Sequence, residues 1–218
     1  GYFRPHEHEV MAKVPALEKS LVIACGALAH EITALLRLNG WNHLEIQCLP
    51  ASLHNQPRLI APAVREKVHQ CRGQFKAIFV AYADCGTGGQ LDKVLAEEKL
   101  ERLPGAHCYE FFWGSHAFLE RHEREPGVFY LTDFLARHFD RLVMDELGIN
   151  RHPQLLETYF SAYSTLVYLA QTESPQTLSL ARSAAQVLGL EFEVIRTGYG
   201  ALEVGLAEFS RASEGMMK

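Results

Sequence analysis

The chain has 218 residues and a formal net charge of −5, and 48% of its residues are hydrophobic while 22% are charged. This is the composition of an ordinary globular protein, and it excludes intrinsic disorder, a collagen-like repeat and a coiled coil. No apolar run reaches the roughly 18 residues of a membrane-spanning helix, and the negative net charge disfavours a broad surface for nucleic acid.

The first half of the chain alternates short apolar runs with segments of helical spacing. Residues 1–19 are polar and charged with weak periodicity and are interpreted as an N-terminal arm. Short apolar runs bounded by turn residues are typical of buried parallel strands, whereas apolar residues three and four positions apart predict helices. The expected strands cover 21–24, 44–49, 75–82 and 107–112. The expected helices end at Asn39-Gly40 and at Gly73, or run through Leu91 and Leu95.

The second half begins with the least regular part of the chain, residues 113–165, which are interpreted as mainly helical. Within this part, Thr132 or Asp133 is expected to cap the N-terminus of a helix. The pattern then becomes regular again. The expected elements are a strand over 166–170, a helix over 175–188, a strand over 192–195 and a final helix.

This alternation predicts an α/β fold with a mostly parallel, Rossmann-like sheet, helices on both faces and a helical insertion at about 113–165, in one domain over 20–212. A unit of strand, cysteine, glycine and helix occurs twice, at Cys25-Gly26 and at Cys85-Gly86, which suggests an internal repeat. Ligands of parallel sheets bind beyond the carboxyl ends of the strands. The residues that follow the predicted strands are therefore the candidates for a functional site.

The most informative segment is the loop that begins at Asp84, which has three glycines in six residues. Gly86, Gly88 and Gly89 leave backbone N–H groups uncovered at a helix start, an arrangement that suits an anion or a closely approaching ligand. The positive end of that helix would lower the pKa of the Cys85 thiol, whereas the Asp84 carboxylate would raise it. The alternative interpretation is a tight turn around a buried cysteine.

Three cysteines are expected at one edge of the sheet. The chain has five cysteines, an odd number that lie far apart, which argues against disulfides and for a reducing, cytoplasmic location. Cys25, Cys85 and Cys108 lie at predicted strand ends, and His54 lies in a loop on the same side. Thiolates and an imidazole form tetrahedral sites for zinc or another thiophilic metal. His107 is the alternative fourth ligand, and each of these residues alone is more often a packing or hydrogen-bonding residue.

Three further residues are candidates for action on a bound ligand. Asp84 or Glu110 would orient the ligand or move a proton, since carboxylates serve as general acids and bases. Tyr199 lies between two glycines after the last predicted strand and would line the cleft. The alternative for Tyr199 is a glycine-rich turn closed by an aromatic ring.

Several segments together resemble one known family, that of domain of unknown function 1638, over about residues 20–208. They are 21–28, 49–55, 82–89, 107–110, 130–134 and 197–200. Members of this family occur in bacteria and methanogenic archaea, and some are encoded near corrinoid-dependent methyltransferase systems. The resemblance therefore implies a role in one-carbon or methylated-amine metabolism, and it implies no catalytic residue.

Three hypotheses follow. The first is a cytoplasmic metal-binding protein, an enzyme on a small molecule, whose Cys3His-type site uses Cys25, Cys85, Cys108 and His54. The second is a metal-free two-thiol enzyme of the racemase or isomerase kind, by analogy of fold alone. The third is a non-catalytic accessory protein of a corrinoid protein or methyltransferase, which exposed apolar surface around 111–113 would favour. No partner among nucleic acids or membranes is expected, and a homo-oligomer stays open.

Overall fold

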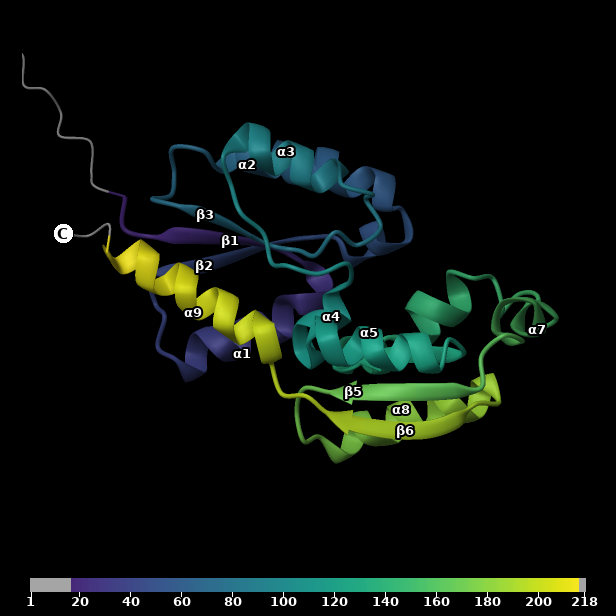
Figure 1. Ribbon diagram of the computed structural model, residues 1–218. Coiled ribbons are helices and arrows are strands. Elements are labelled where there is room, and N and C mark those ends of the chain that lie inside the picture. Colours follow the sequence, from purple (N-terminus) through teal and green to yellow (C-terminus); the bar gives the residue numbers. More distant parts are fainter. Residues whose placement is uncertain (1–16, 216–218) are drawn as a thin grey trace, which may run out of the picture.

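The structure, a computed structural model, describes residues 17–215 and contains two three-stranded sheets with all neighbouring strands parallel (Figure 1). The first sheet has the order β2-β1-β3, with β1 at Ser20–Cys25, β2 at Leu44–Leu49 and β3 at Ile78–Ala81. The second has the order β4-β5-β6, with β4 at Val128–Thr132, β5 at Thr165–Ala170 and β6 at Glu191–Arg196. The predicted α/β class is confirmed, but the strands are divided between two sheets.

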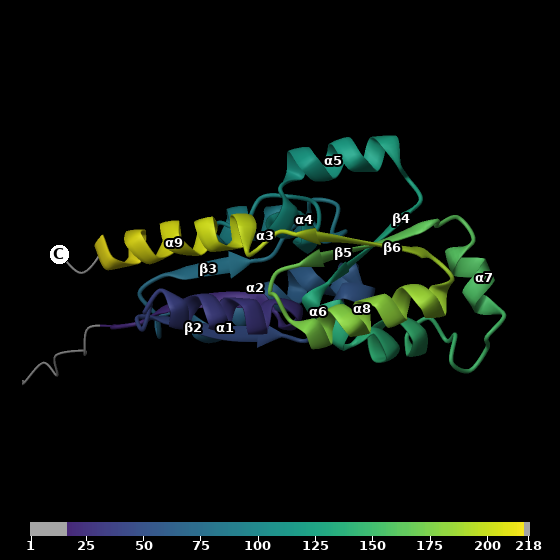
Figure 2. The ribbon, with the colours of Figure 1, turned by 90° about the horizontal axis from the view of Figure 1, so that it is seen from below.

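The first sheet is enclosed by helices on both faces. β1, at its centre, is buried along its whole length, which explains why its sequence is an uninterrupted apolar run after Ser20. Helices α2 and α3 lie on one face, and α1 and α9 lie on the other (Figures 1 and 2). Their bounds are α1 Ala29–Leu38, α2 Ile60–Cys71, α3 Gln90–Glu98 and α9 Gly200–Gly215.

The C-terminal helix α9 follows the second sheet in sequence but packs on the first (Figure 1). The Phe209 ring stacks on Phe79 of β3 with centroids 5.2 Å apart. At the far end of the helix, the Ser213 hydroxyl shares a buried hydrogen bond with the Ser20 hydroxyl at the start of β1. The last helix therefore ties the end of the chain to its first strand.

The second sheet is also covered on both faces. Helices α6 and α8 pack together on one face, and the aromatic side chains of α4 and α5 cover the other. Helix α7 lies near the far end of this unit (Figure 2). The bounds are α4 Cys108–Trp113, α5 Ser115–Arg124, α6 Asp133–Arg137, α7 Leu155–Phe160 and α8 Pro175–Leu188, with a π-helical turn at Asp140–Asp145.

Two predictions about single elements are wrong. Residues 107–112 were expected to form a strand, but Cys108–Trp113 is the helix α4. Helical spacing lets Tyr109 and Trp113 pack on the second sheet while Phe111 and its neighbour pack in the first core. The predicted helical insertion at 113–165 contains the strand β4, because Val128–Thr132 pairs with β5 between two helices.

Three further predictions concern the N-terminal arm, the number of domains and membrane-spanning helices. Most of the predicted arm, residues 1–19, lies outside the described residues, and β1 begins at Ser20. The expectation of one domain over 20–212 stays a prediction. Among helices within residues 17–215, none combines the length and the apolar character that crossing a membrane requires.

Candidate functional site

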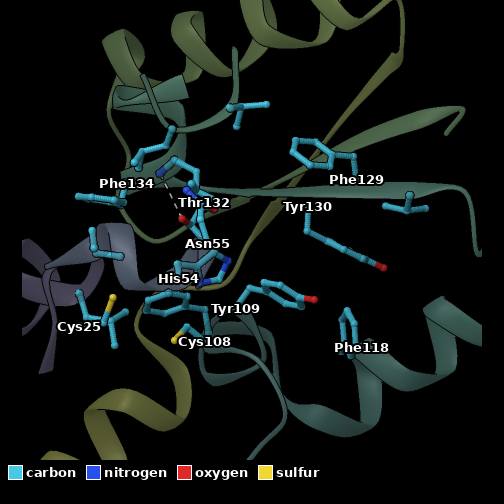
Figure 3. A pocket seen from close by; sticks show the side chains of 18 of the residues that line it. Cys25, His54, Asn55, Cys108, Tyr109, Phe118, Phe129, Tyr130, Thr132 and Phe134 are labelled. Atoms are coloured by element: carbon cyan, nitrogen blue, oxygen red, sulfur yellow. Dashed lines mark hydrogen bonds between the residues drawn. The ribbon is translucent and has the colours of Figure 1, made fainter. Parts of the chain in front are cut away.

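A cavity of about 400 Å³ lies between the carboxyl edge of the first sheet and the second sheet (Figure 3). Its walls come from the end of β1, the 3₁₀ turn Ala51–Asn55 after β2, and parts of α4, α5 and β4. Most of the lining side chains are apolar or aromatic, and a few polar ones, such as Cys25, His54 and Cys108, lie among them. A mainly apolar cavity with a few polar groups is typical of small-molecule sites.

Backbone hydrogen bonds bring two of the predicted thiols together. The Asp84 N–H donates to the Gly105 carbonyl at 3.1 Å, and the Cys85 N–H donates to the Ala106 carbonyl at 2.8 Å. The chain after α3 therefore runs beside the end of β3 before it enters α4. As a result, the Sγ atoms of Cys85 and Cys108 lie 3.2 Å apart although 23 positions separate the residues.

The third predicted thiol, Cys25, lies at the end of the neighbouring strand β1 and lines the cavity together with Cys108 (Figure 3). A charge on Cys85 would raise the pKa of Cys25, and a charge on Cys25 would raise the pKa of Cys108, so the three cysteines form one electrostatic cluster. All three are free thiols. Within the described part of the chain, no three His, Cys, Asp or Glu side chains are already arranged as ligands of one metal ion.

The three thiols differ in acidity. Burial raises the pKa of the Cys25 thiol to about 11. A hydrogen bond from the Cys108 thiol lowers the pKa of Cys85, and the same bond, together with burial, raises the pKa of Cys108. Cys85 is therefore the thiol of the pair that ionises first, with Cys108 as its donor.

The two candidate histidines lie close together at the edge of this cluster. His54 lines the cavity, and its pKa is lowered by partial burial and further by the nearby His107. The His107 ring stacks on Tyr109 with centroids 5.0 Å apart. A lowered pKa keeps the imidazole of His54 neutral at physiological pH, which is the form that binds metals.

The glycine-rich loop is occupied by its own carboxylate. Asp84 accepts hydrogen bonds from the Thr87 hydroxyl at 2.6 Å, the Gly88 N–H at 3.1 Å and the Gly89 N–H at 2.9 Å. Two of the three N–H groups expected to bind an anion, those of Gly88 and Gly89, are thus already used. Cys85, Gly86, Gly88 and Gly89 have positive φ, so the glycines are explained by the turn, and none of these glycines lines the cavity. This geometry favours the alternative interpretation of a tight turn.

Replacing Asp84 by alanine is expected to destabilise the fold by about 1 kcal/mol at pH 7, as for the loss of a helix-capping side chain. Burial alone would raise the pKa of Asp84, but the three hydrogen bonds hold it below its ordinary value. The Asp84 carboxylate therefore stabilises the fold fully above its unfolded pKa of about 4, and this stabilisation is lost as the pH falls through the lower folded pKa. Urea unfolding of the wild type and of Asp84→Ala between pH 7 and pH 2.5 measures this loss. A difference in their free energies of unfolding that does not change with pH would contradict the prediction.

The other two candidates lie outside the cavity lining. Glu110 is buried and accepts a hydrogen bond from the Ser115 hydroxyl at 2.9 Å, which joins α4 to α5. Tyr199 packs against the first core just before α9, and burial raises the pKa of its hydroxyl. Neither residue is among those that line the cavity. The geometry therefore favours a structural role for Glu110 and Tyr199.

Sequence reasoning missed Glu31, a charged residue that lines the cavity from α1. Its exposed fraction is 1%, and neither carboxylate oxygen has a hydrogen-bond partner among residues 17–215. The nearest cation is the guanidinium of Arg137, 3.5 Å from Oε1. Burial raises the pKa of Glu31, although Arg137 opposes this effect. A sequence signal exists, because Glu31 lies three positions after Leu28 and four before Leu35, on the apolar face of the predicted helix.

A second acidic residue, Asp133, ties together the carboxyl ends of β4 and β5. Its buried carboxylate accepts from the Tyr168 hydroxyl at 2.6 Å, the Thr172 hydroxyl at 2.7 Å, and the N–H groups of Gln171 at 3.2 Å and Thr172 at 3.1 Å. The predicted N-cap just before it is Thr132, whose hydroxyl accepts from the Leu135 N–H. This network fixes the wall of the cavity that β4 supplies.

Comparison with known proteins places the chain in a family. No curated protein matches it. A family model described as protein of unknown function (DUF1638) matches residues 48–206, which include His54, Cys85 and Cys108 but not Cys25. This range is shorter at its start than the resemblance seen in the sequence. Because the match covers most of the chain, this protein belongs to the DUF1638 family.

Proposed function

We propose that this protein binds a small molecule in the cavity and a thiophilic metal ion, with zinc as the simplest case, at the thiol cluster. The ligands would be Cys25, Cys85 and Cys108, with His54 or His107 as the fourth. The observation that carries the proposal is the 3.2 Å distance between the free Cys85 and Cys108 sulfurs. Two sulfurs bound to one tetrahedral zinc ion at about 2.3 Å lie about 3.8 Å apart. A small rotation of either side chain would bring the Cys85 and Cys108 sulfurs to that separation.

The acidity of the cluster supports a cation at this place. The hydrogen bond to Cys85 and burial raise the pKa of Cys108, and the charge of a Cys85 thiolate raises it further, so the Cys108 thiol keeps its proton. A divalent ion removes the repulsion between the two thiolates and displaces the protons. The neutral imidazole of His54 at the same cavity completes a donor set of sulfur and nitrogen, which suits zinc.

The position of the cluster supports an enzymatic role. Cys25 and Cys108 face a cavity that is large enough for a small ligand. A bound metal with an open position would activate water, a thiol or a methyl acceptor there. In this proposal the substrate belongs to one-carbon or methylated-amine metabolism in the cytoplasm, as the resemblance to the family implies.

The alternatives find less support in the geometry. A two-thiol racemase would place Cys25 and Cys85 on opposite sides of its substrate, but they follow the paired strands β1 and β3, and Cys85 is not among the residues that line the cavity. An accessory role was favoured by exposed apolar surface at 111–113, but Phe111 and Phe112 are buried. A corrinoid protein or methyltransferase as partner stays a proposal.

Elemental analysis of untagged protein purified without oxygen tests the metal site. We expect about one metal ion per chain, and its loss in Cys25→Ser, Cys85→Ser and Cys108→Ser. Cys48→Ser is the matched control, because Cys48 is a free, exposed thiol of β2 and should leave the metal content unchanged. Thermal unfolding of each variant establishes that it is folded. Metal-free wild-type protein, or a metal content that the three substitutions leave unchanged, would overturn the proposal.

A further inference from the structure

The cavity holds one buried carboxylate whose oxygens are not satisfied by the protein. Glu31 is the only Asp, Glu, Lys or Arg among the lining residues, it is 1% exposed, and neither of its oxygens accepts a hydrogen bond from the described residues. Buried carboxylates are normally paired, because an unpaired buried charge is costly. A group that enters the cavity is therefore the natural partner of Glu31.

The neighbouring charges favour a cation as that partner. The Arg137 guanidinium lies 3.5 Å from Oε1 of Glu31, but 27% of the Arg137 side chain is exposed, so water screens this ion pair. This partly solvated ion pair supplies Glu31 with no hydrogen bond from the described residues, so a cation inside the cavity would gain a contact that Arg137 does not provide. The described residues that line the cavity include two histidines, His54 and His122, but no lysine or arginine. An anionic ligand would find no permanent positive charge among these lining side chains and would meet the Glu31 carboxylate.

The rest of the lining suits the apolar part of a cation. Seven tyrosine and phenylalanine side chains line the cavity. Tyr109, Tyr130 and Phe118 form a connected group, with ring centroids 5.5 Å apart for the two tyrosines and 5.2 Å from Phe118 to each (Figure 3). The faces of aromatic rings attract ammonium groups and their polarised alkyl substituents. One cavity with a buried carboxylate and an aromatic lining is a chemical match for an organic ammonium ion.

We infer that the cavity binds a small organic monocation, an ammonium with apolar substituents, whose nitrogen pairs with Glu31 and whose substituents pack on the aromatic side chains. The inference rests on the small-molecule part of the proposed function, and it is independent of a metal at the thiols. It names a class of ligand and a residue, Glu31, that recognises its charge.

Titration calorimetry with two matched pairs of probes tests this inference. Choline is compared with the neutral isostere 3,3-dimethyl-1-butanol, and benzylamine with benzyl alcohol. We expect at least one ammonium to bind about tenfold more tightly than its neutral partner, as an aromatic and carboxylate site predicts. Glu31→Gln should remove this preference. Glu208→Gln, at an exposed position of α9, should retain it.

The outcomes separate the inference from the proposed function. Equal binding of both members of each pair, no binding of any probe, or a preference that survives Glu31→Gln would overturn the inference. Metal content is measured on the same preparations. A thiol site that fails while the ammonium preference holds contradicts only the metal part of the proposed function. Retained metal without any ammonium preference contradicts only the present inference, and thermal unfolding confirms that Glu31→Gln is folded.

Discussion

Replacing Asp133 by alanine is expected to destabilise the protein by about 4 kcal/mol, because it removes the acceptor of a buried network. The Asp133 side chain has an exposed fraction of 0% and accepts two backbone N–H groups and two hydroxyls. The donors are Tyr168, Gln171 and Thr172, all at the carboxyl end of β5 or just beyond it. Without the carboxylate these donors would stay buried and unsatisfied, and the ends of β4 and β5 would separate.

Urea unfolding followed by circular dichroism measures this loss. Asp140→Ala is the control, since Asp140 is exposed and accepts a single hydrogen bond from Asn150, and its loss should cost under about 1 kcal/mol. Asp133→Asn should fall between the two, because its amide oxygen still accepts some of these hydrogen bonds while its NH2 group faces other donors. Equal destabilisation by Asp133→Ala and Asp140→Ala would contradict the role assigned to this network.

Replacing Gly200 by alanine is expected to cost at least about 3 kcal/mol, because it combines backbone strain with a steric clash. Gly200 is the first residue of α9 and has a φ of +51°. An added Cβ would overlap the carbonyl oxygens of Phe111 and Phe112 at the end of α4, and backbone atoms cannot move aside as a flexible side chain can. The substitution would therefore push α9 away from α4.

Gly198 is a matched control for this prediction. It lies two positions earlier with a φ of +60°, and an added Cβ would meet no atom within 4 Å. Gly198→Ala therefore measures the strain alone, which should cost about 1 kcal/mol. The difference between the two free energies of unfolding isolates the clash. Equal values for both variants would show that α9 does not depend on the close approach at Gly200.

The candidate site shows how far sequence reasoning reached. The convergence of Cys25 and Cys85 was predictable, because the carboxyl ends of neighbouring parallel strands meet at one edge, and β1 pairs with β3. Cys108 was expected there for the wrong reason, since it begins a helix and not a strand. Glu31 was missed, because its lack of partners depends on what α1 packs against.

The glycine loop shows the limit of a local pattern. Its composition correctly indicated a turn with positive φ, but the same pattern suits a turn that binds an anion and a turn that binds its own aspartate. The two kinds of turn differ in whether the Asp84 side chain points into the loop, as it does here. Its position depends on the backbone hydrogen bonds that join residues 84–85 to the chain before α4.

The amino-acid sequence by itself determined most of the buried parallel strands and helices, with α4 and β4 as the exceptions, and it placed cysteines at the ends of two strands, because apolar periodicity and turn residues act locally. The tertiary structure alone decided that the strands divide into two sheets, that α9 returns to the first of them, and that a cavity with an unsatisfied Glu31 lies between them. Those features depend on contacts between residues far apart in the chain, as between Phe79 and Phe209. No local pattern encodes such pairs, since each partner is buried only when the other is in place.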